Sequence, residues 1–526
     1  MIGAAEGGMI GAAEVVLSGA QDTAQETTFE VTLDGLDRPH EECGVVGVYA
    51  WPTSDVDVAR LSFFSLYALQ HRGQESAGIC VSDGRRALLH KGMGLVAQVF
   101  TEENLRPLTG HLAIGHNRYS TTGASSLNNA QPYLIETLHG PMSVGHNGNL
   151  TNTHILRRRL LERGVGLIST SDTEVITQMI AAPPESGEPN GPDWLARIRN
   201  FMAVAEGAYC IVILTRDAIW AARDPLGLRP LCIGELLGER GRNRDEVLGH
   251  VVASESCALG TIDARYVREV APGEIIRFDA DGVHSFSGKK PASKSALCVF
   301  EYVYFSRPDS VLEDQTIHAV RQRLGKRLWE ESPVEADMVM GVPDSAIPAA
   351  IGFANASGIP FSEGLTKNRY IGRTFIEPTD RQRRSTVTLK YNPLKANLEG
   401  KRVVLIDDSI VRGNTCGPLV RLLREAGAIE VHVRVSSPPV AHPCFMGVDM
   451  ATHEELIGHR MTVDQIRQHV GADTLAYLSR EGMLAEVAGD RPPGGHCDAC
   501  FSGNYPLDVS AWLSKKSDDR KNAFEG

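Results

Sequence analysis

Short apolar runs separated by turn residues dominate the first half of the chain. Runs of this length, bounded by glycine, asparagine or aspartate, are typical of buried strands. The predicted strands are Val45–Tyr49, Leu112–Ile114, Tyr209–Leu214 and Val251–Ala253, and the predicted helices are Leu61–Gln70, Thr153–Arg163 and Thr173–Ala181. Ser171 with Glu174 three residues later predicts a capping box at the start of the last helix. Strands with interspersed helices favour a layered α+β domain.

From about residue 306 onward, predicted strands and helices alternate. The strands are Asp337–Val342, Lys401–Ile406 and Glu430–Val435, and the helices are Gln315–Glu331, Ser345–Ala356 and Thr415–Ala426. Alternation of this kind builds a parallel sheet with right-handed crossovers, so this half is predicted to be an α/β domain. The stretch Lys367–Tyr391 is basic and lacks a period, which is typical of a functional loop.

Composition and charge narrow the class of protein. The chain has 526 residues, with 53 Lys and Arg against 65 Asp and Glu, a net charge of −12 that disfavours non-specific nucleic-acid binding. No apolar run reaches the ~18 residues that a membrane helix needs. The first residues lack the basic region and apolar core of a secretory signal, so a cytoplasmic location is expected. Ten cysteines are too sparse for a disulfide scaffold in a chain of this length.

Residues 1–42 differ from the rest of the chain. The sequence MIGAAE occurs twice, at Met1–Glu6 and Met9–Glu14, and the segment has nine acidic residues against the single base Arg38. Weakly apolar, like-charged segments do not bury enough surface to fold, so this leader is predicted to be disordered. Because it holds most of the net negative charge, the case against nucleic-acid binding depends on the lack of a DNA-reading element.

The first candidate site begins at Cys43, which opens the first predicted strand. A cysteine there is more often a small buried apolar residue. Other residues change this interpretation. Arg118 can bind a carboxylate, Asn147 and the backbone N–H of Gly148 can donate to an oxyanion, and Asp172 can bind an ammonium group. Together they describe a pocket for an amino acid with a reactive amide.

These residues resemble the class II glutamine amidotransferases, which are N-terminal-nucleophile hydrolases. The resemblance implies that the leader is removed and that Cys43 becomes the first residue. Its α-amino group, with a pKa of about 8, then acts as the base for its own thiol. It also implies the roles of the pocket residues: attack on the glutamine amide by Cys43, oxyanion binding by Asn147 and Gly148, and glutamine binding by Arg72, Arg118, Thr121 and Asp172.

The second candidate site follows an apolar run that ends in two acids, Asp407 and Asp408. A strand followed by a glycine-containing loop and a helix start aims backbone N–H groups at a phosphate. The acids can hold ribose hydroxyls directly or through Mg²⁺, although such a pair can also simply cap a helix. The string resembles the type I phosphoribosyltransferase motif.

This second resemblance implies a role for each residue of the motif and its neighbours. Asp407 and Asp408 face the ribose, and a loop at Gly341–Ser345 binds pyrophosphate, with Ser345 near the metal. Asn414 stands where the family often has threonine, so its contact with phosphate is expected to come from the backbone. The residues expected to bind phosphoribosyl pyrophosphate are Asp407, Asp408, Ser409, Ile410, Val411, Arg412, Gly413, Asn414, Thr415, Lys367, Arg369, Tyr370, Arg373, Tyr304 and Asp344. Magnesium is expected at Ser345, Asp407 and Asp408.

Four further cysteines form the third candidate site. Cys497 and Cys500 make a C-x-x-C pair, and Cys298 and Cys444 lie upstream. Four thiolates can bind zinc or an iron–sulfur cluster, and spacing alone does not choose between them.

The combination resembles the amidophosphoribosyltransferase family from about Glu41 to Tyr505, with close matches at Tyr302–Ser310 and Ser436–Cys444. The resemblance implies that ammonia released from glutamine is channelled to phosphoribosyl pyrophosphate, giving 5-phosphoribosylamine, pyrophosphate and glutamate. This is the first step of purine biosynthesis. Tyr304 and Arg307 are expected to couple the two sites. The iron–sulfur branch of the family carries the four cysteines, which favours a [4Fe-4S] cluster over zinc. Inhibition by purine nucleotides and a homotetramer are also expected.

The resemblance also divides the chain. The expected parts are a propeptide at 1–42, a four-layer αββα glutaminase domain at 43–297, a phosphoribosyltransferase domain with a parallel sheet at 298–463, and a C-terminal helical segment with cluster ligands at 464–526.

Three other classes of protein share parts of this pattern. Glutamine–fructose-6-phosphate transaminases share the first domain but lack Asp407 and Asp408 with the loop that follows. A phosphoribosylpyrophosphate-sensing transcription regulator would need a basic DNA-binding element, whereas the front half here carries Cys43 and its pocket. An inactive scaffold is disfavoured because no catalytic position that could be matched is substituted.

Overall fold

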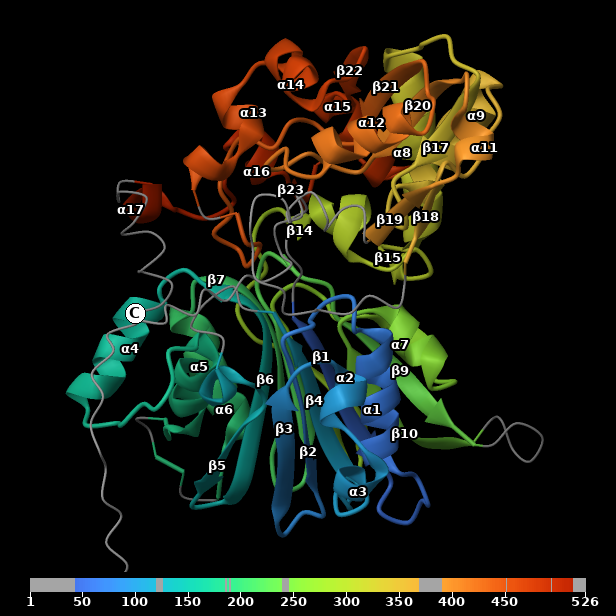
Figure 1. Ribbon diagram of the computed structural model, residues 1–526. Helices are drawn as coiled ribbons and strands as arrows, with labels where there is room; N and C mark the ends of the chain where they lie inside the picture. Colours follow the sequence, from blue (N-terminus) through green and yellow to red (C-terminus); the bar gives the residue numbers. More distant parts are fainter. Residues whose placement is uncertain are drawn as a thin grey trace, which may run out of the picture.

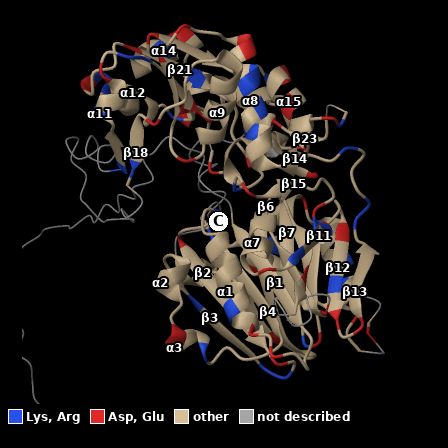
Figure 2. Ribbon diagram, turned by 90° about the vertical axis from the view of Figure 1, so that its right-hand side faces the viewer, with Lys and Arg blue, Asp and Glu red and all other residues tan. Residues whose placement is uncertain are grey.

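The chain forms two lobes in the computed structural model, which describes residues 43–119, 126–184, 187–188, 191–238, 246–368, 390–450, 452–492 and 494–513. The N-terminal half makes the lower lobe and the C-terminal half the upper lobe (Figure 1). Charges of both signs occur on each lobe (Figure 2). Five predicted features lie outside the described residues: the leader 1–42, Thr121 of the glutamine pocket, and Arg369, Tyr370 and Arg373 of the basic loop.

The first of the two sheets in the first lobe is antiparallel and has seven strands, in the order β11-β9-β10-β1-β4-β2-β3. Its central strand β1 (Gly44–Ala50) is buried along its whole length and pairs with β4 and β10. Because β1 begins directly after Cys43, this sheet fixes the position of that residue. The other strands are β2 (Ser76–Ser82), β3 (Ala87–Met93), β4 (Leu112–Arg118), β9 (Cys232–Leu237), β10 (Val247–Ala253) and β11 (Arg265–Glu269).

A six-stranded antiparallel sheet packs against the first, in the order β13-β12-β8-β7-β6-β5. Its longest strand, β6 (Gly140–Leu150), carries Asn147 and Gly148 and pairs with β7 (Gly207–Leu214). The other strands are β5 (Tyr133–Thr137), β8 (Ile219–Arg223), β12 (Glu274–Asp279) and β13 (Gly282–Ser287).

Helices cover the outer faces of both sheets. Leu66 of α1 packs with Ile79 outside the first sheet, Ile176 of α5 packs with Ile211 outside the second, and Tyr49 and Val212 meet between the sheets. The first face carries α1 (Val58–Ala68), α2 (Val96–Val99), α3 (Glu102–Leu105) and α7 (Ser256–Thr261), and the second carries α4 (Thr153–Glu162), α5 (Asp172–Ala181) and α6 (Trp194–Val204). The predicted four-layer αββα fold is confirmed.

The second lobe contains a parallel sheet in the order β17-β20-β21-β22. Its strands are β17 (Met338–Gly341), β20 (Arg402–Asp407), β21 (Glu430–Val435) and β22 (Thr474–Tyr477), and its larger helices are α8 (Ile317–Glu331), α9 (Ile347–Ser357), α12 (Cys416–Glu425), α14 (Val463–Val470) and α15 (Arg480–Ala488). The predicted parallel sheet is confirmed. It also extends beyond residue 463, where the C-terminal segment is expected to begin.

Short elements complete the chain, and some of them join distant segments. The two-residue strands β14 (Leu297–Cys298) and β23 (His496–Cys497) pair in parallel and bring two cysteines side by side. The remaining elements are η1 (Leu127–Asn129), the π-helical turn η2 (Glu301–Phe305), β15 (Val311–Leu312), β16 (Gln315–Thr316), β18 (Leu365–Lys367), β19 (Tyr391–Pro393), α11 (Lys395–Leu398), η3 (His453–Glu455), α13 (Ile457–Arg460), α16 (Ala499–Ser502) and α17 (Ser510–Leu513).

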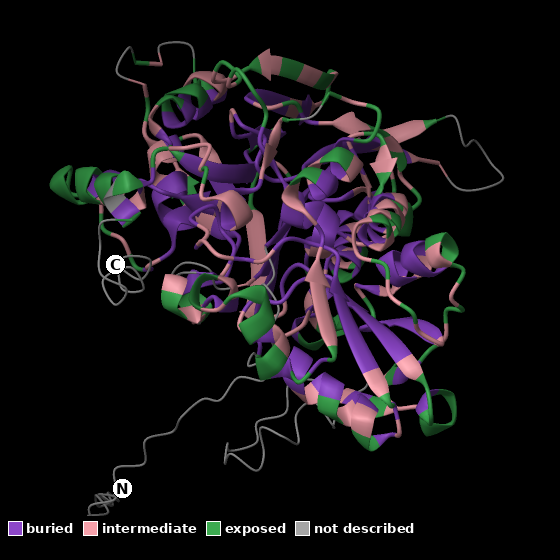
Figure 3. Cartoon of the chain, turned by 90° about the horizontal axis from the view of Figure 1, so that it is seen from above, coloured by how far each residue is buried: buried purple, intermediate pink, exposed green. Residues whose placement is uncertain are grey.

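The buried residues lie in the interior of both lobes, as Figure 3 shows from above.

Among the described residues, no helix combines the length and apolarity needed to cross a membrane.

One local prediction is wrong in part. Ser171 does cap α5, accepting a hydrogen bond from the N–H of Thr173. Glu174, however, accepts from the N–H groups of Ile168 and Ser169 and from the hydroxyl of Ser169. Its carboxylate therefore fixes the loop before the helix, and no capping box forms.

Candidate functional site

Cys43 is buried in the first lobe, directly before β1. Only 8% of the residue is exposed, and its thiol donates to the carbonyl of Tyr119 at 3.6 Å. Burial raises the pKa of the thiol to about 11, against the lowering effects of the hydrogen bond to Tyr119 and the charge of Arg118. A thiol with this pKa is neutral near pH 7, so it needs a nearby base to become a nucleophile.

The oxyanion residues predicted from the sequence lie on β6, which packs against β1 and β4. Asn147 is 1% exposed, and neither its side-chain oxygen nor its nitrogen has a hydrogen-bond partner among the described residues. Gly148 has a φ of 141°, and a Cβ at this position would lie 2.1 Å from the carbonyl oxygen of Ala208. An unsatisfied buried amide costs about 1–3 kcal/mol, so the site is suited to a ligand that pairs with it.

The charged residues of the pocket surround the thiol. The guanidinium Nη1 of Arg118 lies 3.2 Å from Oε2 of Glu75. Asp172 accepts from the N–H of Leu150 at 3.2 Å and lies 3.5 Å from Nδ1 of His146. Burial would raise the pKa of Asp172, but His146 and the N–H of Leu150 outweigh it and lower the pKa overall. The sequence analysis missed Glu75 and His146, since no spacing rule marks either as a partner of the site.

Arg72 has a different set of contacts from that expected of a glutamine ligand. Its Nε donates to the carbonyl of Cys43 at 3.2 Å, and its two Nη atoms contact Glu255 at 2.6 Å and Glu301 at 2.8 Å. Burial opposes the charge of Arg72, but the two carboxylates outweigh it and raise the pKa of the guanidinium. Arg72 therefore fixes the backbone of Cys43 and joins the first lobe to Glu301.

The second site lies at the carboxyl end of β20, in the second lobe. Asp407 and Asp408 are buried there, and Asp408 accepts from the hydroxyls of Ser345 at 2.5 Å and Ser409 at 3.0 Å. Ser345 comes from the loop after β17, the parallel neighbour of β20. The carboxyl ends of adjacent parallel strands meet at one edge, which is where ligands of open α/β sheets bind.

The loop after β20 leads into the N-terminus of α12, at Thr415. Gly413 has a φ of 82°, and a Cβ there would lie 2.5 Å from Cδ1 of Ile457. Arg412 turns away to pair with Glu455 at 3.0 Å, and Asn414 is exposed. The backbone N–H groups of this loop therefore remain the donors best suited to a phosphate.

The start of the basic loop contacts the predicted pyrophosphate loop. Nζ of Lys367 lies 2.7 Å from Oδ2 of Asp344, and the hydroxyl of Tyr391 donates to the carbonyl of Pro343 at 3.3 Å. Both ends of the basic loop thus contact the same turn.

A buried turn lies between the two sites. Glu301 at the start of η2 pairs with Arg72, and the backbone N–H of Arg307 donates to Glu255 at 2.9 Å. Arg321 of α8, which is fully buried, donates to the carbonyls of Tyr304 at 2.7 Å and Ser306 at 2.8 Å. Burial lowers the pKa of Arg321 to about 10 against the opposing charge of Asp408. The turn is thus connected to Cys43 through Arg72, and Arg321, which holds its carbonyls, is influenced by the charge of Asp408.

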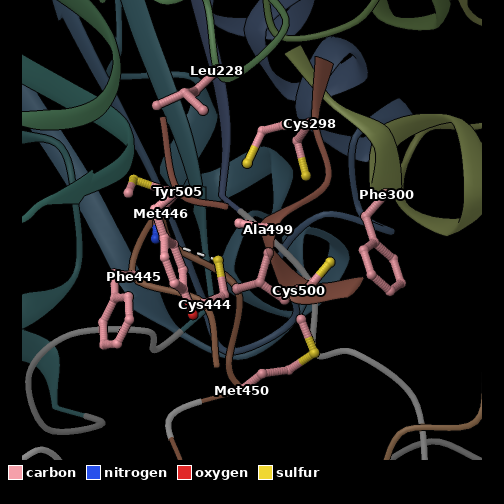
Figure 4. A pocket seen from close by; sticks show the side chains of 12 residues that line it. Leu228, Cys298, Phe300, Cys444, Phe445, Met446, Met450, Ala499, Cys500 and Tyr505 are labelled. Atoms are coloured by element: carbon pink, nitrogen blue, oxygen red, sulfur yellow. Dashed lines mark hydrogen bonds between the residues drawn. The ribbon is translucent and has the colours of Figure 1, made fainter. Parts of the chain in front are cut away.

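The four cysteines of the third site come from three distant segments. Cys298 and Cys497 are paired across β14 and β23, Cys500 lies in α16, and Cys444 lies in a loop. Figure 4 shows Cys298, Cys444 and Cys500 around one space with an apolar lining. Burial raises the pKa of Cys298 to about 11 and also raises the pKa values of Cys497 and Cys500, and the neighbouring thiols raise them further.

The spacing of these thiols bears on which metal they fit. Among the described residues, one group of His, Cys, Asp or Glu side chains has three metal-binding atoms within 4.8 Å of one another. It consists of Asp279, Asp281 and His284 on a surface hairpin, and none of the four cysteines belongs to it. No three of the four cysteine sulfurs therefore all lie within 4.8 Å of one another. Zinc–sulfur bonds of 2.3 Å in a tetrahedron need sulfurs about 3.8 Å apart. A cluster occupies the space between its thiolates and accepts the wider spacing.

Comparisons with known proteins match both halves of the chain. The family model for the glutamine amidotransferase domain matches residues 116–242, and the model for the phosphoribosyl transferase domain matches residues 309–438. The chain is 48% identical over 507 residues to the amidophosphoribosyltransferase of Rattus norvegicus, covering 89% of this chain and 98% of the relative. It is 51% identical over 474 residues to that of Synechocystis sp., covering 90% and 92%.

Two solved structures are similar over most of the chain. The glutamine phosphoribosylpyrophosphate amidotransferase of B. subtilis, complexed with ADP and GMP, gives a TM-score of 0.80 at 44% identity and covers 89% of this chain and 98% of its own. A structure described as the allosteric regulatory enzyme of purine biosynthesis gives a TM-score of 0.82 at 43% identity and covers 92% and 99%.

Proposed function

The chain belongs to the amidophosphoribosyltransferase family, and we propose that it divides the family's reaction between its two lobes. At Cys43, glutamine and water give glutamate and ammonia. At Asp407 and Asp408, ammonia displaces pyrophosphate from C1 of phosphoribosyl pyrophosphate and gives 5-phosphoribosylamine. Formation of 5-phosphoribosylamine is the first step of purine biosynthesis.

The glutaminase step starts with removal of residues 1–42. The freed α-amino group of Cys43 accepts the thiol proton, and the sulfur attacks the glutamine amide carbon. The negative charge that develops on the amide oxygen is stabilised by Asn147 and the N–H of Gly148, each such donor contributing about 3–4 kcal/mol. The carbon–nitrogen bond then breaks, ammonia leaves with the transferred proton, and water hydrolyses the thioester to glutamate.

The remaining pocket residues select glutamine. Arg118 binds the α-carboxylate and Asp172 binds the α-ammonium group, with Thr121 completing the pocket. Asp172 suits this role because its pKa is held low, so it is a carboxylate at neutral pH. We propose that Arg72 is a positioning residue, because its guanidinium already pairs with two carboxylates.

The transferase step uses the edge of the parallel sheet. Asp407 and Asp408 hold the ribose hydroxyls, and the backbone of residues 409–415 holds the 5′-phosphate. With Ser345 they would hold Mg²⁺, which when bound neutralises the charge that develops on pyrophosphate. Lys367 and Asp344 lie at the pyrophosphate end. Arg369 and Arg373 add positive charge there, and Tyr370 excludes water.

Ammonia has to pass between the lobes without meeting bulk water, because at pH 7 it would become ammonium, which is not a nucleophile. The turn from Glu301 to Arg307, with Tyr304 at its centre, has the contacts to link the two sites. Glu301 pairs with Arg72 beside Cys43, and the carbonyl of Tyr304 is held by Arg321 near Asp408.

For the four cysteines we propose a [4Fe-4S] cluster with Cys298, Cys444, Cys497 and Cys500 as ligands. The wide spacing of the sulfurs supports a cluster over zinc. Anaerobic purification with metal and sulfide analysis tests this: about four irons per chain are expected. One zinc per chain without iron would contradict it.

The remaining proposals concern the whole enzyme. Ten free cysteines support a reducing, cytoplasmic location. Purine nucleotides are proposed as inhibitors, since the B. subtilis relative is complexed with ADP and GMP and a loop that holds a 5′-phosphate suits a nucleotide. A homotetramer is proposed from the family resemblance.

One observation supports the assignment of the two steps to different lobes more than any other. The buried pair Asp407 and Asp408 lies at the edge of the parallel sheet, whereas Cys43 precedes a strand of a different sheet. Asp408→Asn should lower synthesis with glutamine and with ammonia alike by roughly 10–100-fold, because it removes one charged contact. Hydrolysis of glutamine without phosphoribosyl pyrophosphate should persist. Asp464→Asn, at an exposed acid paired with Arg467, is the control. Retained synthesis in Asp408→Asn would contradict the assignment.

A further inference from the structure

The segment that follows Cys444 contacts the end of β6 that carries the oxyanion residues. Nδ2 of Asn149 donates to the carbonyl of Phe445 at 3.0 Å, a buried hydrogen bond between residues 296 apart in the sequence. At Gly447, an added Cβ would lie 3.3 Å from the carbonyl carbon of Gly148. Phe445–Gly447 therefore lies directly against Gly148 and Asn149.

The same segment is held from a second side. Nη2 of Arg229, a fully buried residue, donates to the carbonyl of Met446 at 2.5 Å. Nη1 of Arg229 lies 3.8 Å from Oε1 of Glu301, the carboxylate that also binds Arg72. Two first-lobe side chains, Asn149 and Arg229, thus hold consecutive carbonyls of one short segment.

The other end of the segment is attached to the four-cysteine site. The N–H of Met446 donates to Sγ of Cys444 at 3.3 Å, the dashed bond in Figure 4. Phe445 packs against the rings of Tyr505 and Trp512, and Nε1 of Trp512 donates to the carbonyl of Thr151, just after β6. A displacement of Cys444 would move residues that contact Gly148 and Asn149 directly and Thr151 through Trp512.

We propose that Phe445–Gly447 couples the four-cysteine site to the glutaminase site, with Asn149 and Arg229 as positioning residues. While the cysteines hold their metal, the segment supports Gly148 and Asn149 in the position that aims the N–H of Gly148 at the oxyanion. Loss of the metal frees Cys444 and weakens that support. The inference rests on the proposed function, because it takes Gly148 as an oxyanion donor and Cys444 as a metal ligand.

Coupling of this kind is reciprocal. If the metal stabilises the oxyanion site, a ligand that fills the oxyanion site must stabilise the metal. The effect on metal release can then be measured without measuring enzyme activity.

The experiment compares rates of metal release from the processed enzyme before and after Cys43 is alkylated by a diazo-ketone analogue of glutamine. The ketone oxygen of the bound analogue takes the place of the oxyanion. Release into a chelator should slow by about five-fold on alkylation, the factor that corresponds to one hydrogen bond of ordinary strength. In Asn149→Ala the difference between the two forms should disappear.

Asn152→Ala is the matched control. Asn152 also donates its Nδ2 to a backbone carbonyl, that of Val204, at 2.8 Å, and it lies in the same domain without contacting the Cys444 segment. The protective effect of alkylation should survive in this variant. If Asn149→Ala fails to fold, the isosteric Asn149→Asp serves instead, since it replaces the donor with an acceptor.

Hydrogen exchange of the peptide that covers β6 provides a second readout. Removing the metal from the processed enzyme should increase exchange at residues 147–149 more than elsewhere in β6. Equal metal release from alkylated and free enzyme, or a protective effect that persists in Asn149→Ala, would overturn the inference.

Failure of the proposed function gives different results. If the analogue does not label Cys43, the glutaminase assignment is wrong. If the metal is zinc, the cluster assignment is wrong, while zinc release still decides whether the two sites are coupled.

Discussion

The thiol of Cys43 is buried, neutral and held against the carbonyl of Tyr119, so its reactivity depends on the residue that precedes it. While residue 42 is attached, the nitrogen of Cys43 is an amide and cannot accept a proton. Once the leader is removed, an α-amino group with an ordinary pKa of about 8 lies on the same residue. In the proposed mechanism, the leader therefore controls the glutaminase through a single proton acceptor.

This account predicts how alkylation of Cys43 depends on pH. In the unprocessed chain the thiol has a pKa of about 11, so the thiolate fraction, and with it the rate, should rise about tenfold per pH unit from pH 7 to pH 10. In the processed enzyme the rate should already be high near pH 8. Mass spectrometry of the Cys43 peptide after iodoacetamide treatment measures both. A plateau by pH 8 in the unprocessed chain would contradict the account.

At this scale the sequence indicated candidate reactive residues, which stay predictions, but not their partners. Cys43, Arg118 and Asp172 were recognisable because their chemistry fits one substrate. Glu75, Glu255 and Glu301 were not, because a carboxylate that pairs with a buried arginine from a distant segment follows no spacing rule. Arg72 shows the consequence: its motif placed it in the pocket, while its contacts are with two carboxylates and a backbone carbonyl.

The element that matters most for the proposed glutaminase step is β6, because it carries the two residues proposed to bind the oxyanion, Asn147 and Gly148. Gly148 adopts a positive φ within the strand, and the carbonyl of Ala208 on the neighbouring strand β7 leaves no room for a side chain. Asn147 and Gly148 nevertheless keep their pairing with Cys210 and Tyr209 of β7, so the register of the strand is unbroken at this glycine.

Gly148→Ala should therefore remove the oxyanion site. The added Cβ would meet the carbonyl of Ala208, and the backbone would have to shift. We expect glutamine-dependent synthesis to fall by roughly 10²–10³-fold, the loss found for one oxyanion donor, with ammonia-dependent synthesis unchanged. Gly166→Ala, where an added Cβ meets nothing within 4 Å, is the control. An unchanged glutaminase rate in Gly148→Ala would show that Gly148 has no such role.

Regular elements were predictable, and short ones were not. The strands Val45–Tyr49 and Glu430–Val435 were found within one residue of their bounds because apolar runs define them. The pair β14 and β23 has two residues each and no period, and it forms because two distant segments meet at the cysteines. Gln315, expected in a helix, lies in β16, because it pairs with Leu312 in a short hairpin whose two turn residues have positive φ.

The whole molecule is two catalytic lobes joined by a buried charged contact. Arg72 and Glu255 of the first lobe and Glu301 of the turn make a network with no exposed side chain. A buried charge left without its partner is costly, so this network holds the lobes in one relative position.

Glu301→Gln should lower the free energy of unfolding by about 3 kcal/mol, the lower end of the range for a broken buried ion pair, since Glu255 still faces Arg72. Chemical denaturation followed by circular dichroism measures this loss. Glu102→Gln, which removes the exposed partner of Arg60, should cost less than about 1 kcal/mol. Equal small losses in both variants would mean that the Arg72–Glu301 contact is not structural.

The central claim is that Cys43 only supplies ammonia and that Asp407 and Asp408 only consume it. The most direct measurement is the rate of 5-phosphoribosylamine formation by Cys43→Ala, once with glutamine and once with a high concentration of free ammonia. Glutamine-dependent synthesis should fall by at least about 10³-fold, as for loss of a catalytic nucleophile, while ammonia-dependent synthesis stays within about two-fold of the parent enzyme. Equal loss of both activities would contradict the account.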